Sequence, residues 1–122
     1  MRECRKKRNP FYSNRVAIYD IESFIALHPE KAAKKRWRIY KRDGYTCVSC
    51  GVVGISVVWW RERKGASHYD LLAIKNGSEV MMTMDHTVPK AKGGSNKDSN
   101  VTCMCEPCNS KKADKLPEIE NA

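Results

Sequence analysis

Residues 85–112 have the sequence DHTVPKAKGGSNKDSNVTCMCEPCNSKK, and this stretch decides the fold. Asp85 and His86 come first and are followed by two glycines, by Asn100, and by a two-residue-spaced cysteine pair that leads directly into Asn109. Each feature alone is common in proteins, since a histidine beside an aspartate is usually a surface pair. The whole set in this order is far more specific, and it indicates a catalytic group of oxygen- and nitrogen-bearing side chains next to a cysteine pair.

The residues around this stretch predict a hairpin, a loop and a helix. Two strands rich in β-branched and apolar residues flank Asn76-Gly77, which is a strong two-residue hairpin turn signal. The loop is predicted at residues 89–99, because it contains two adjacent glycines. The other predicted elements are strands at 69–75 and 79–85, a short extended piece near 100–104, and a final helix from Pro107 to about Lys115.

The residues that precede the hairpin predict two helices and one more strand. Asp20 is a suitable N-cap for a short helix that ends at Leu27. A second helix is predicted from Glu30 to Asp43, with Gly44 as its C-terminal stop. On this helix we expect a core-facing stripe, and a β-branched and aromatic strand follows it. The stripe is Ala33, Trp37 and Tyr40, and the strand is residues 55–61.

Four of the six cysteines form two matched pairs, Cys47-x-x-Cys50 and Cys105-x-x-Cys108. The turn within such a pair lets both sulfurs reach one tetrahedral ion, and four thiolates close the site to water. The sequence therefore predicts a structural zinc ion that ties the start of the module to its last helix. Cys103 leaves an alternative open, because Cys103-x-Cys105 offers another choice of ligand.

The charge of the chain favours a polyanionic partner. The 122 residues carry a formal net charge of +9, and nucleic acid is the commonest partner of so basic a chain. Residues 1–44 hold 13 Lys and Arg against 5 Asp and Glu, whereas residues 45–122 hold 10 against 9. The first segment is therefore predicted to be a phosphate-binding arm, although a solubilising tail has the same composition.

No apolar run in the sequence is long enough for a membrane span, and the basic N-terminus lacks the apolar stretch of a signal peptide. We therefore expect a cytoplasmic protein in a reducing (host-cell) interior. In such a compartment cysteines are more often metal ligands than disulfides.

The ordered set Asp-His, Gly-Gly, Asn and Cys-x-x-Cys-Asn-x-x-Lys resembles the HNH (His-Asn-His) endonuclease superfamily over about residues 36–115. The lead-in at residues 36–47, RWRIYKRDGYTC, also resembles small phage-encoded and mobile-element members. The resemblance implies a ββα-metal site, in which a hairpin, a loop and a helix surround one divalent ion. It further implies a metal-dependent endonuclease that hydrolyses phosphodiester bonds in DNA, by nicking one strand or cutting both.

The resemblance also assigns roles to individual residues. His86 matches the general base, and histidine suits that role because its ring titrates near neutral pH. Asp85 and Asn109 resemble the two metal positions, and their oxygens suit Mg²⁺ or Mn²⁺ better than zinc. Asn100 resembles the middle residue, which fixes the loop and helps to orient the histidine. Lys112 lies on the same helical face as Asn109 and could contact a phosphate.

The sequence departs from the His-Asn-His motif at one position, because Asn109 stands where the motif has its second histidine. In this it resembles phage junction-resolving enzymes, and the departure leaves the ion preference open.

The predicted fold is α+β: a basic extension with two short helices (1–44), a ββα-metal (HNH) module with a Cys4 zinc site and an extra β-hairpin (45–116), and a tail (117–122). We expect basic residues of the second helix to hold DNA, namely Lys34, Lys35, Arg38, Lys41 and Arg42.

Two other functions stay open at this stage. One is a catalytically silent zinc-ribbon protein that binds nucleic acid. The other is an auxiliary nuclease that is active only within a phage DNA-processing or packaging complex. A homodimer also stays open.

Overall fold

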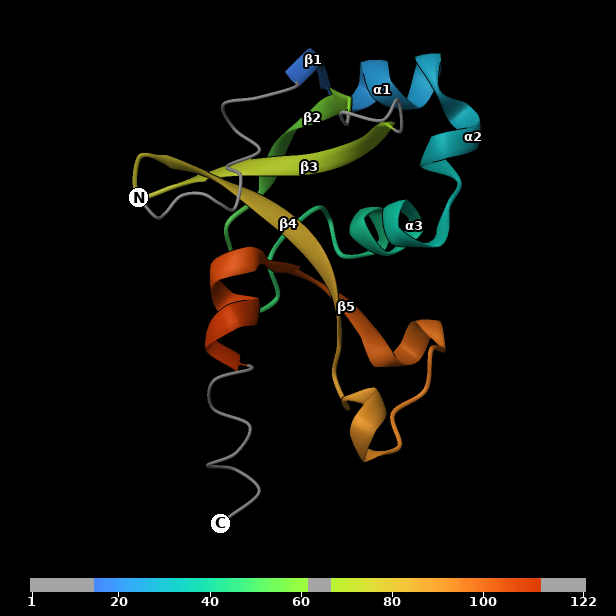
Figure 1. Ribbon diagram of the computed structural model, residues 1–122, viewed down its shortest axis with the longest axis vertical. Coiled ribbons are helices and arrows are strands. Elements are labelled where there is room, and N and C mark those ends of the chain that lie inside the picture. The colour runs from blue at the N-terminus through green and yellow to red at the C-terminus, as the bar shows by residue number, and fades with distance from the viewer. Residues whose placement is uncertain (1–14, 62–66, 113–122) are drawn as a thin grey trace.

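A computed structural model describes residues 15–61 and 67–112 and has a mixed fold of helices and one antiparallel sheet (Figure 1). The predicted end of the last helix and the predicted tail at 117–122 lie outside these residues. In chain order the elements are β1 (Arg15–Asp20), α1 (Ile21–Leu27), α2 (Pro29–Ala32), α3 (Lys35–Arg42), β2 (Gly54–Arg61), β3 (Ser67–Lys75), β4 (Ser78–His86), the 3-10 turns η1 (Lys90–Lys92) and η2 (Asp98–Asn100), and β5 (Val101–Cys105). A helix at residues 106–112 follows β5 directly.

The sheet has five strands in the order β1-β2-β3-β4-β5, and every neighbouring pair is antiparallel. The three strands predicted at 55–61, 69–75 and 79–85 are confirmed as β2, β3 and β4, and the short extended piece near 100–104 is confirmed as β5. β1 is an addition to the prediction, and its Ile18 pairs with Val58 of β2. One sheet therefore contains residues from both sides of position 44.

The turn between β3 and β4 forms as its sequence predicts. Asn76 and Gly77 both have positive φ, at 54° and 82°, and the ladder closes with Lys75 opposite Ser78. Two consecutive positive φ angles match the right-handed twist of the flanking strands, and Asn-Gly adopts them at low cost. This turn sets the register that brings Asp85 and His86 to the far end of β4.

The first predicted helix is confirmed as α1, and Oδ1 of its N-cap Asp20 accepts a hydrogen bond from Ser23 N at 2.7 Å. The prediction of one helix from Glu30 to Asp43 is wrong, because the chain forms α2 and α3 with an extended residue, Lys34 (ψ 158°), between them. The break changes the direction of the helix, so Ala33 is exposed and does not join the core.

The main core lies between α1, α3 and the inner face of the sheet. Phe24, Trp37 and Tyr40 are buried there, with ring centroids 4.6 Å apart for Phe24 and Trp37 and 5.1 Å apart for Trp37 and Tyr40. The hydroxyl of Tyr40 donates a hydrogen bond to the carbonyl oxygen of Met82 at 3.2 Å. This bond and the aromatic packing fix α3 against β4, the strand that carries Asp85 and His86.

None of the helices in the described part of the chain has the length and apolar character that a membrane crossing requires.

Candidate active site and metal centre

Two strands and the helix after them form the framework of the candidate site. β4 pairs with β5 so that Asp85 lies opposite Thr102 and His86 lies opposite Val101. The 106–112 helix begins directly after β5, and Figure 1 shows it beside the β4–β5 pair. This is the strand, strand and helix arrangement that the sequence predicts for residues 79–112.

The carboxylate of Asp85 is in contact with the 106–112 helix. Nζ of Lys112 lies 2.6 Å from Oδ2 of Asp85 and donates a second hydrogen bond of 2.6 Å to the carbonyl oxygen of His86. Both side chains are largely covered, at 16% exposure for Asp85 and 28% for Lys112. We expect the ammonium group of Lys112 to contact a DNA phosphate. In this structure, without DNA, it contacts the end of β4.

Asn109 lies against the same face of β4. Its Nδ2 donates to Oγ1 of Thr83 at 3.1 Å, and Thr83 in turn donates to the carbonyl oxygen of Met104 at 2.8 Å. Thr83 and Asp85 are alternate residues of one strand, so their side chains share a face. Asn109 and Lys112 are three residues apart on the helix and share a face as well. Thr83 and Asp85 on the strand and Asn109 and Lys112 on the helix thus form one cluster of contacting side chains.

This cluster fits a hard divalent cation. A carboxylate and an amide oxygen are the ligands that Mg²⁺ and Mn²⁺ prefer. Among the described residues, Oδ1 of Asn109 accepts no hydrogen bond, whereas its Nδ2 is used on Thr83. The amide is thus oriented by its nitrogen, and its oxygen is left for a ligand.

His86 is the last residue of β4, and its ring contacts the following loop. Nε2 lies 2.8 Å from Oδ1 of Asn96. Asn96 was not predicted as a site residue, and no local pattern marks it, because it is one polar residue in a loop of many. Only the path of the loop brings it to the histidine.

Asn100 fixes the loop that begins after His86. Its Oδ1 accepts from the backbone N–H of Val88 at 2.9 Å, and its Nδ2 donates to the carbonyl oxygens of Val88 at 3.1 Å and Ser95 at 2.7 Å. These three bonds join the two ends of the loop. The side chain of Asn100 therefore holds the loop, and the direct contact with His86 comes from Asn96.

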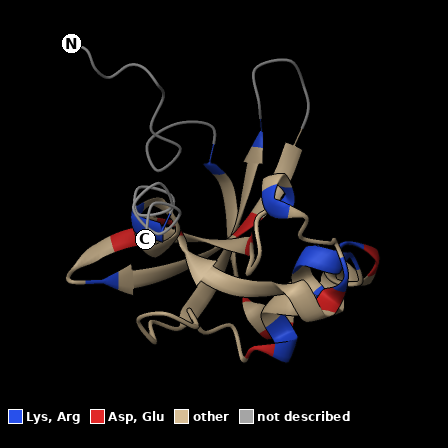
Figure 2. Cartoon of the chain, turned by 90° about the horizontal axis from the view of Figure 1, so that it is seen from below, with Lys and Arg blue, Asp and Glu red and all other residues tan. Residues whose placement is uncertain are grey.

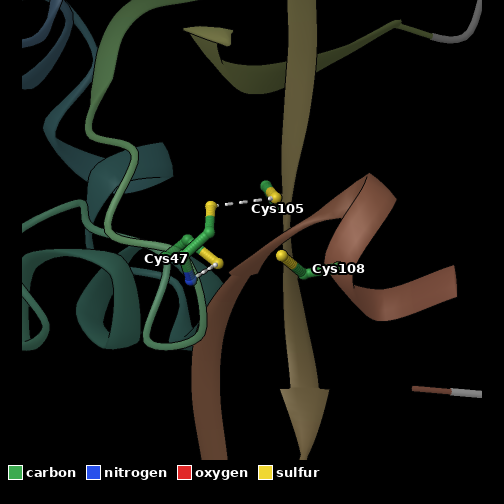
Figure 3. A group of neighbouring side chains, drawn as sticks. Cys47, Cys105 and Cys108 are labelled. Carbon is green, nitrogen blue, oxygen red and sulfur yellow. Dashed lines mark hydrogen bonds between the residues drawn. The ribbon is translucent and has the colours of Figure 1, made fainter. Parts of the chain in front are cut away.

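The four cysteines of the two predicted pairs form one cluster. The sulfurs of Cys47, Cys50, Cys105 and Cys108 all lie within 4.8 Å of one another. Figure 3 shows Cys47, from the loop that follows α3, facing Cys105 and Cys108. Four sulfurs at this spacing fit a tetrahedral zinc ion. Cys103 is outside the cluster and fully buried. Of the two alternative ligands Cys103 and Cys105, it is therefore Cys105 whose sulfur joins the cluster.

The surroundings of the cluster favour a thiolate at Cys50 and a thiol at Cys105. The backbone N–H of Val52 and the ammonium of Lys75 lower the pKa of Cys50 to about 6. Nζ of Lys75 lies 3.5 Å from the sulfurs of both Cys105 and Cys108. Burial raises the pKa of Cys105 to about 12, so a bound ion would have to displace that proton. The positive charge of Lys75 offsets part of the negative charge of four thiolates.

Comparison with known families agrees with this geometry. Residues 75–119 match the family model described as HNH endonuclease. This segment of the chain is therefore similar to HNH endonucleases. The matched segment begins at the end of β3 and includes Asp85, His86, Asn100, the second cysteine pair and Asn109. Comparisons with curated proteins and with solved structures gave no match.

Several of the basic residues that we expect to bind DNA contact the loop after β4 in this structure. Nζ of Lys35 donates to the carbonyl oxygen of Asn96. Arg38 forms an ion pair with Asp98 at 2.9 Å, and Nη1 of Arg42 donates to the carbonyl oxygen of Asp98 at 2.8 Å. Figure 2 shows basic positions on the helices with acidic positions close by. Part of the positive charge of α3 thus holds residues 96–98 in place.

Within residues 15–61 and 67–112, the remaining two residues of that set, Lys34 and Lys41, have no hydrogen bond to this loop. Lys41 is exposed on α3. Lys34 lines a small hollow of about 210 Å³ together with Lys31 and Arg36. The ammonium groups of these lysines are therefore available to a phosphate backbone, whereas the guanidinium groups of Arg38 and Arg42 are bound to the loop.

The second glycine of the loop is needed for close packing. A Cβ added to Gly94 would lie 1.7 Å from the carbonyl oxygen of Val88, and the N–H of Gly94 donates to Pro89 O at 3.0 Å. The same Val88 carbonyl is bound by Asn100. A side chain at position 94 would therefore push away the loop end that follows His86.

We expect Gly94→Ala to lower DNA cleavage by a factor on the order of 10 to 10², because the loop that contacts His86 must move. Zinc content should stay at the wild-type value, since the four cysteines belong to the loop after α3, to β5 and to the helix after it. Cleavage rate and zinc content are the two measurements. Ala91→Ser, an exposed change in the same loop, is the matched control, and equal rates for the two variants would refute the packing explanation.

Proposed function

We propose that this protein is a metal-dependent endonuclease that hydrolyses phosphodiester bonds in DNA, with His86 as the general base. The observation that supports the proposal is the contact of one helix face, through Asn109 and Lys112, with the end of β4 that carries Asp85 and His86. Asn109 is bound to Thr83, and Lys112 from the same helix face is bound to Asp85. An oxygen-rich cluster and an imidazole thus lie on neighbouring residues of one strand end.

The reaction requires an activated water, neutralisation of phosphate charge and help for the departing 3′ oxygen. His86 takes a proton from the water that attacks phosphorus, because imidazole is an effective base near neutral pH. Asp85 and Asn109 supply oxygen ligands for Mg²⁺ or Mn²⁺. Such an ion would supply Lewis-acid stabilisation of the negative charge that develops on the phosphate. Lys112 adds a positive charge beside the Asp85 carboxylate.

A basic hollow beside the cluster supports DNA as the substrate. It has a volume of about 430 Å³, and its lining includes Lys75, Lys111 and Lys112. Lys112 lines the hollow and also binds Asp85, and Cys50 and Cys108 of the cysteine cluster line the hollow as well. The net charge of +9 favours the same partner and implies that binding weakens as salt rises.

The structural role of zinc completes the proposal. A zinc ion bound by the two cysteine pairs would join the loop after α3 to the start of the 106–112 helix. A four-thiolate zinc ion has no open position, so it would hold the helix against β4 and take no part in the reaction. The catalytic ion and the structural ion would then be different metals at different donor sets.

The proposal is tested with supercoiled, linear and branched DNA incubated with purified zinc-loaded protein and added Mg²⁺ or Mn²⁺. Omission of the divalent ion is a better negative control than a chelator, because a chelator would also remove the structural zinc. We expect cleavage only with the added ion, and the product pattern will separate nicking from double-strand cutting. DNA binding without ion-dependent cleavage on any substrate would refute the nuclease proposal and support a silent nucleic-acid-binding protein.

A further inference from the structure

The contact between His86 and Asn96 has a chemical consequence for the base. Nε2 of His86 lies 2.8 Å from Oδ1 of Asn96. An amide oxygen only accepts hydrogen bonds, so Nε2 must carry the proton that is shared in this contact. In a neutral imidazole the other nitrogen, Nδ1, then has the free lone pair.

We propose that Asn96 is a positioning residue that holds the neutral ring of His86 in the Nε2–H tautomer and so makes Nδ1 the atom that accepts the proton from water. This inference rests on the proposed function for its catalytic meaning. The tautomer itself is a property of the folded protein without DNA. A general base needs a lone pair, and a ring with its proton on the wrong nitrogen would point an N–H at the water.

The loop that carries Asn96 is held from both sides. On one side, Lys35 of α3 donates to the carbonyl oxygen of Asn96 itself. On the other, Asn100 binds the carbonyl oxygen of Ser95, the residue before it, at 2.7 Å. Asn96 therefore meets His86 from a backbone position that is already fixed.

Residue Asp98, two positions further along, adds to this support. Arg38 binds its carboxylate at 2.9 Å, and Arg42 binds its carbonyl oxygen at 2.8 Å and that of Val101 at 2.6 Å. The loop is thus anchored to a helix that is itself packed on β4 through Tyr40. Such support lets one amide oxygen set the orientation and the tautomer of the ring.

The direct test is the ring nitrogen spectrum of His86, measured by long-range ¹H–¹⁵N NMR on zinc-loaded protein without DNA or added divalent ion. The pH should be about 8.5, where histidine rings are predominantly neutral. The chain has 3 histidines, so His86→Ala identifies the signals by their loss. We expect a protonated Nε2 and an unprotonated Nδ1 in the wild type. A protonated Nδ1 would overturn the proposal.

Variants at position 96 separate this role from a general effect on the loop. Asn96→Ala should shift the His86 signals toward a mixture of tautomers, whereas Asn96→Asp should keep the wild-type pattern, because a carboxylate also accepts from Nε2–H. Ser99→Ala, an exposed change in the same loop, is the matched control and should leave the signals unchanged. An unchanged spectrum in Asn96→Ala would overturn the proposal.

Cleavage by the same variants adds a functional measurement. Asn96→Ala should lower kcat roughly 10-fold or more with KM near the wild-type value, and Asn96→Asp should restore part of the loss. An equal loss in Ser99→Ala and Asn96→Ala would overturn the specific role. Absence of cleavage in every protein would refute the nuclease proposal alone, because the ring spectrum decides the tautomer independently.

Discussion

Replacement of His86 by alanine is expected to lower DNA cleavage by roughly 10²-fold or more, because the variant has no group that can take the proton from the attacking water. Folding should be unaffected, since the ring lies at the end of β4, where its hydrogen-bond partner is the loop residue Asn96. DNA affinity should also stay near the wild-type value. Initial cleavage rates, thermal unfolding and DNA binding are the three measurements.

A second histidine serves as the matched control. His68 lies on β3, where its ring contacts the carboxylate of Asp70 at 3.0 Å, and its side chain is 45% exposed. His68→Ala removes the same ring at a position that is outside the site, so its cleavage rate should match the wild type. Undiminished cleavage by His86→Ala would remove His86 from the proposed role.

Replacement of Cys50 by serine is expected to expel zinc and unfold the protein under conditions in which the wild type is folded. A structural zinc site contributes on the order of 10 kcal/mol to folding, and serine is a poor zinc ligand. Cys50 is the best of the four positions to change, because it is exposed and its own packing contributes little, whereas Cys47 and Cys105 are buried. Zinc content per chain and thermal unfolding are the measurements.

Cys103→Ala is the control for the zinc prediction. Cys103 is buried and lies outside the four-sulfur cluster, and burial raises the pKa of its thiol to about 12. The variant should keep one zinc per chain and lose only about 1 kcal/mol of stability from the lost packing. A folded, zinc-free Cys50→Ser protein, or loss of zinc from Cys103→Ala, would contradict the assignment of the ligands.

The parts of the fold that could be predicted from the sequence depend on local chemistry. Asn76-Gly77 specifies its own turn, Asp20 specifies its own helix start, and the two cysteine pairs are spaced for one metal. Strands β2, β3 and β4 follow from β-branched and apolar residues between turn signals. The order of Asp85, His86 and Asn109 indicated the family, and the family match at residues 75–119 agrees with it.

The parts that could not be predicted depend on contacts between distant residues. β1 is a short strand whose partner, β2, lies some forty residues further along the chain, as the pairing of Ile18 with Val58 shows. The break at Lys34 falls within a run of good helix formers, and α3 is placed by the packing of Trp37 and Tyr40 in the core. Helix propensity alone does not contain that information.

The roles of the basic residues show the same limit. From the sequence, a lysine or arginine on an exposed helix face is a candidate for binding phosphate. In the fold, Arg38 and Arg42 have partners about sixty residues away, at Asp98 and Val101. Asn96 was not predicted for the same reason. It is a candidate site residue because it lies close to His86, and the sequence does not show that distance.

The central claim is that Asp85 and Asn109 hold one divalent cation beside His86, and Mn²⁺ binding measured by electron paramagnetic resonance tests it most directly. Zinc-loaded His86→Ala protein without DNA is titrated with Mn²⁺ and compared with the same protein carrying Asp85→Ala or Asn109→Ala. We predict one bound Mn²⁺ per chain in the parent and a large loss of affinity in both additional variants, with zinc content and folding unchanged. Equal Mn²⁺ binding in all three proteins would contradict the account.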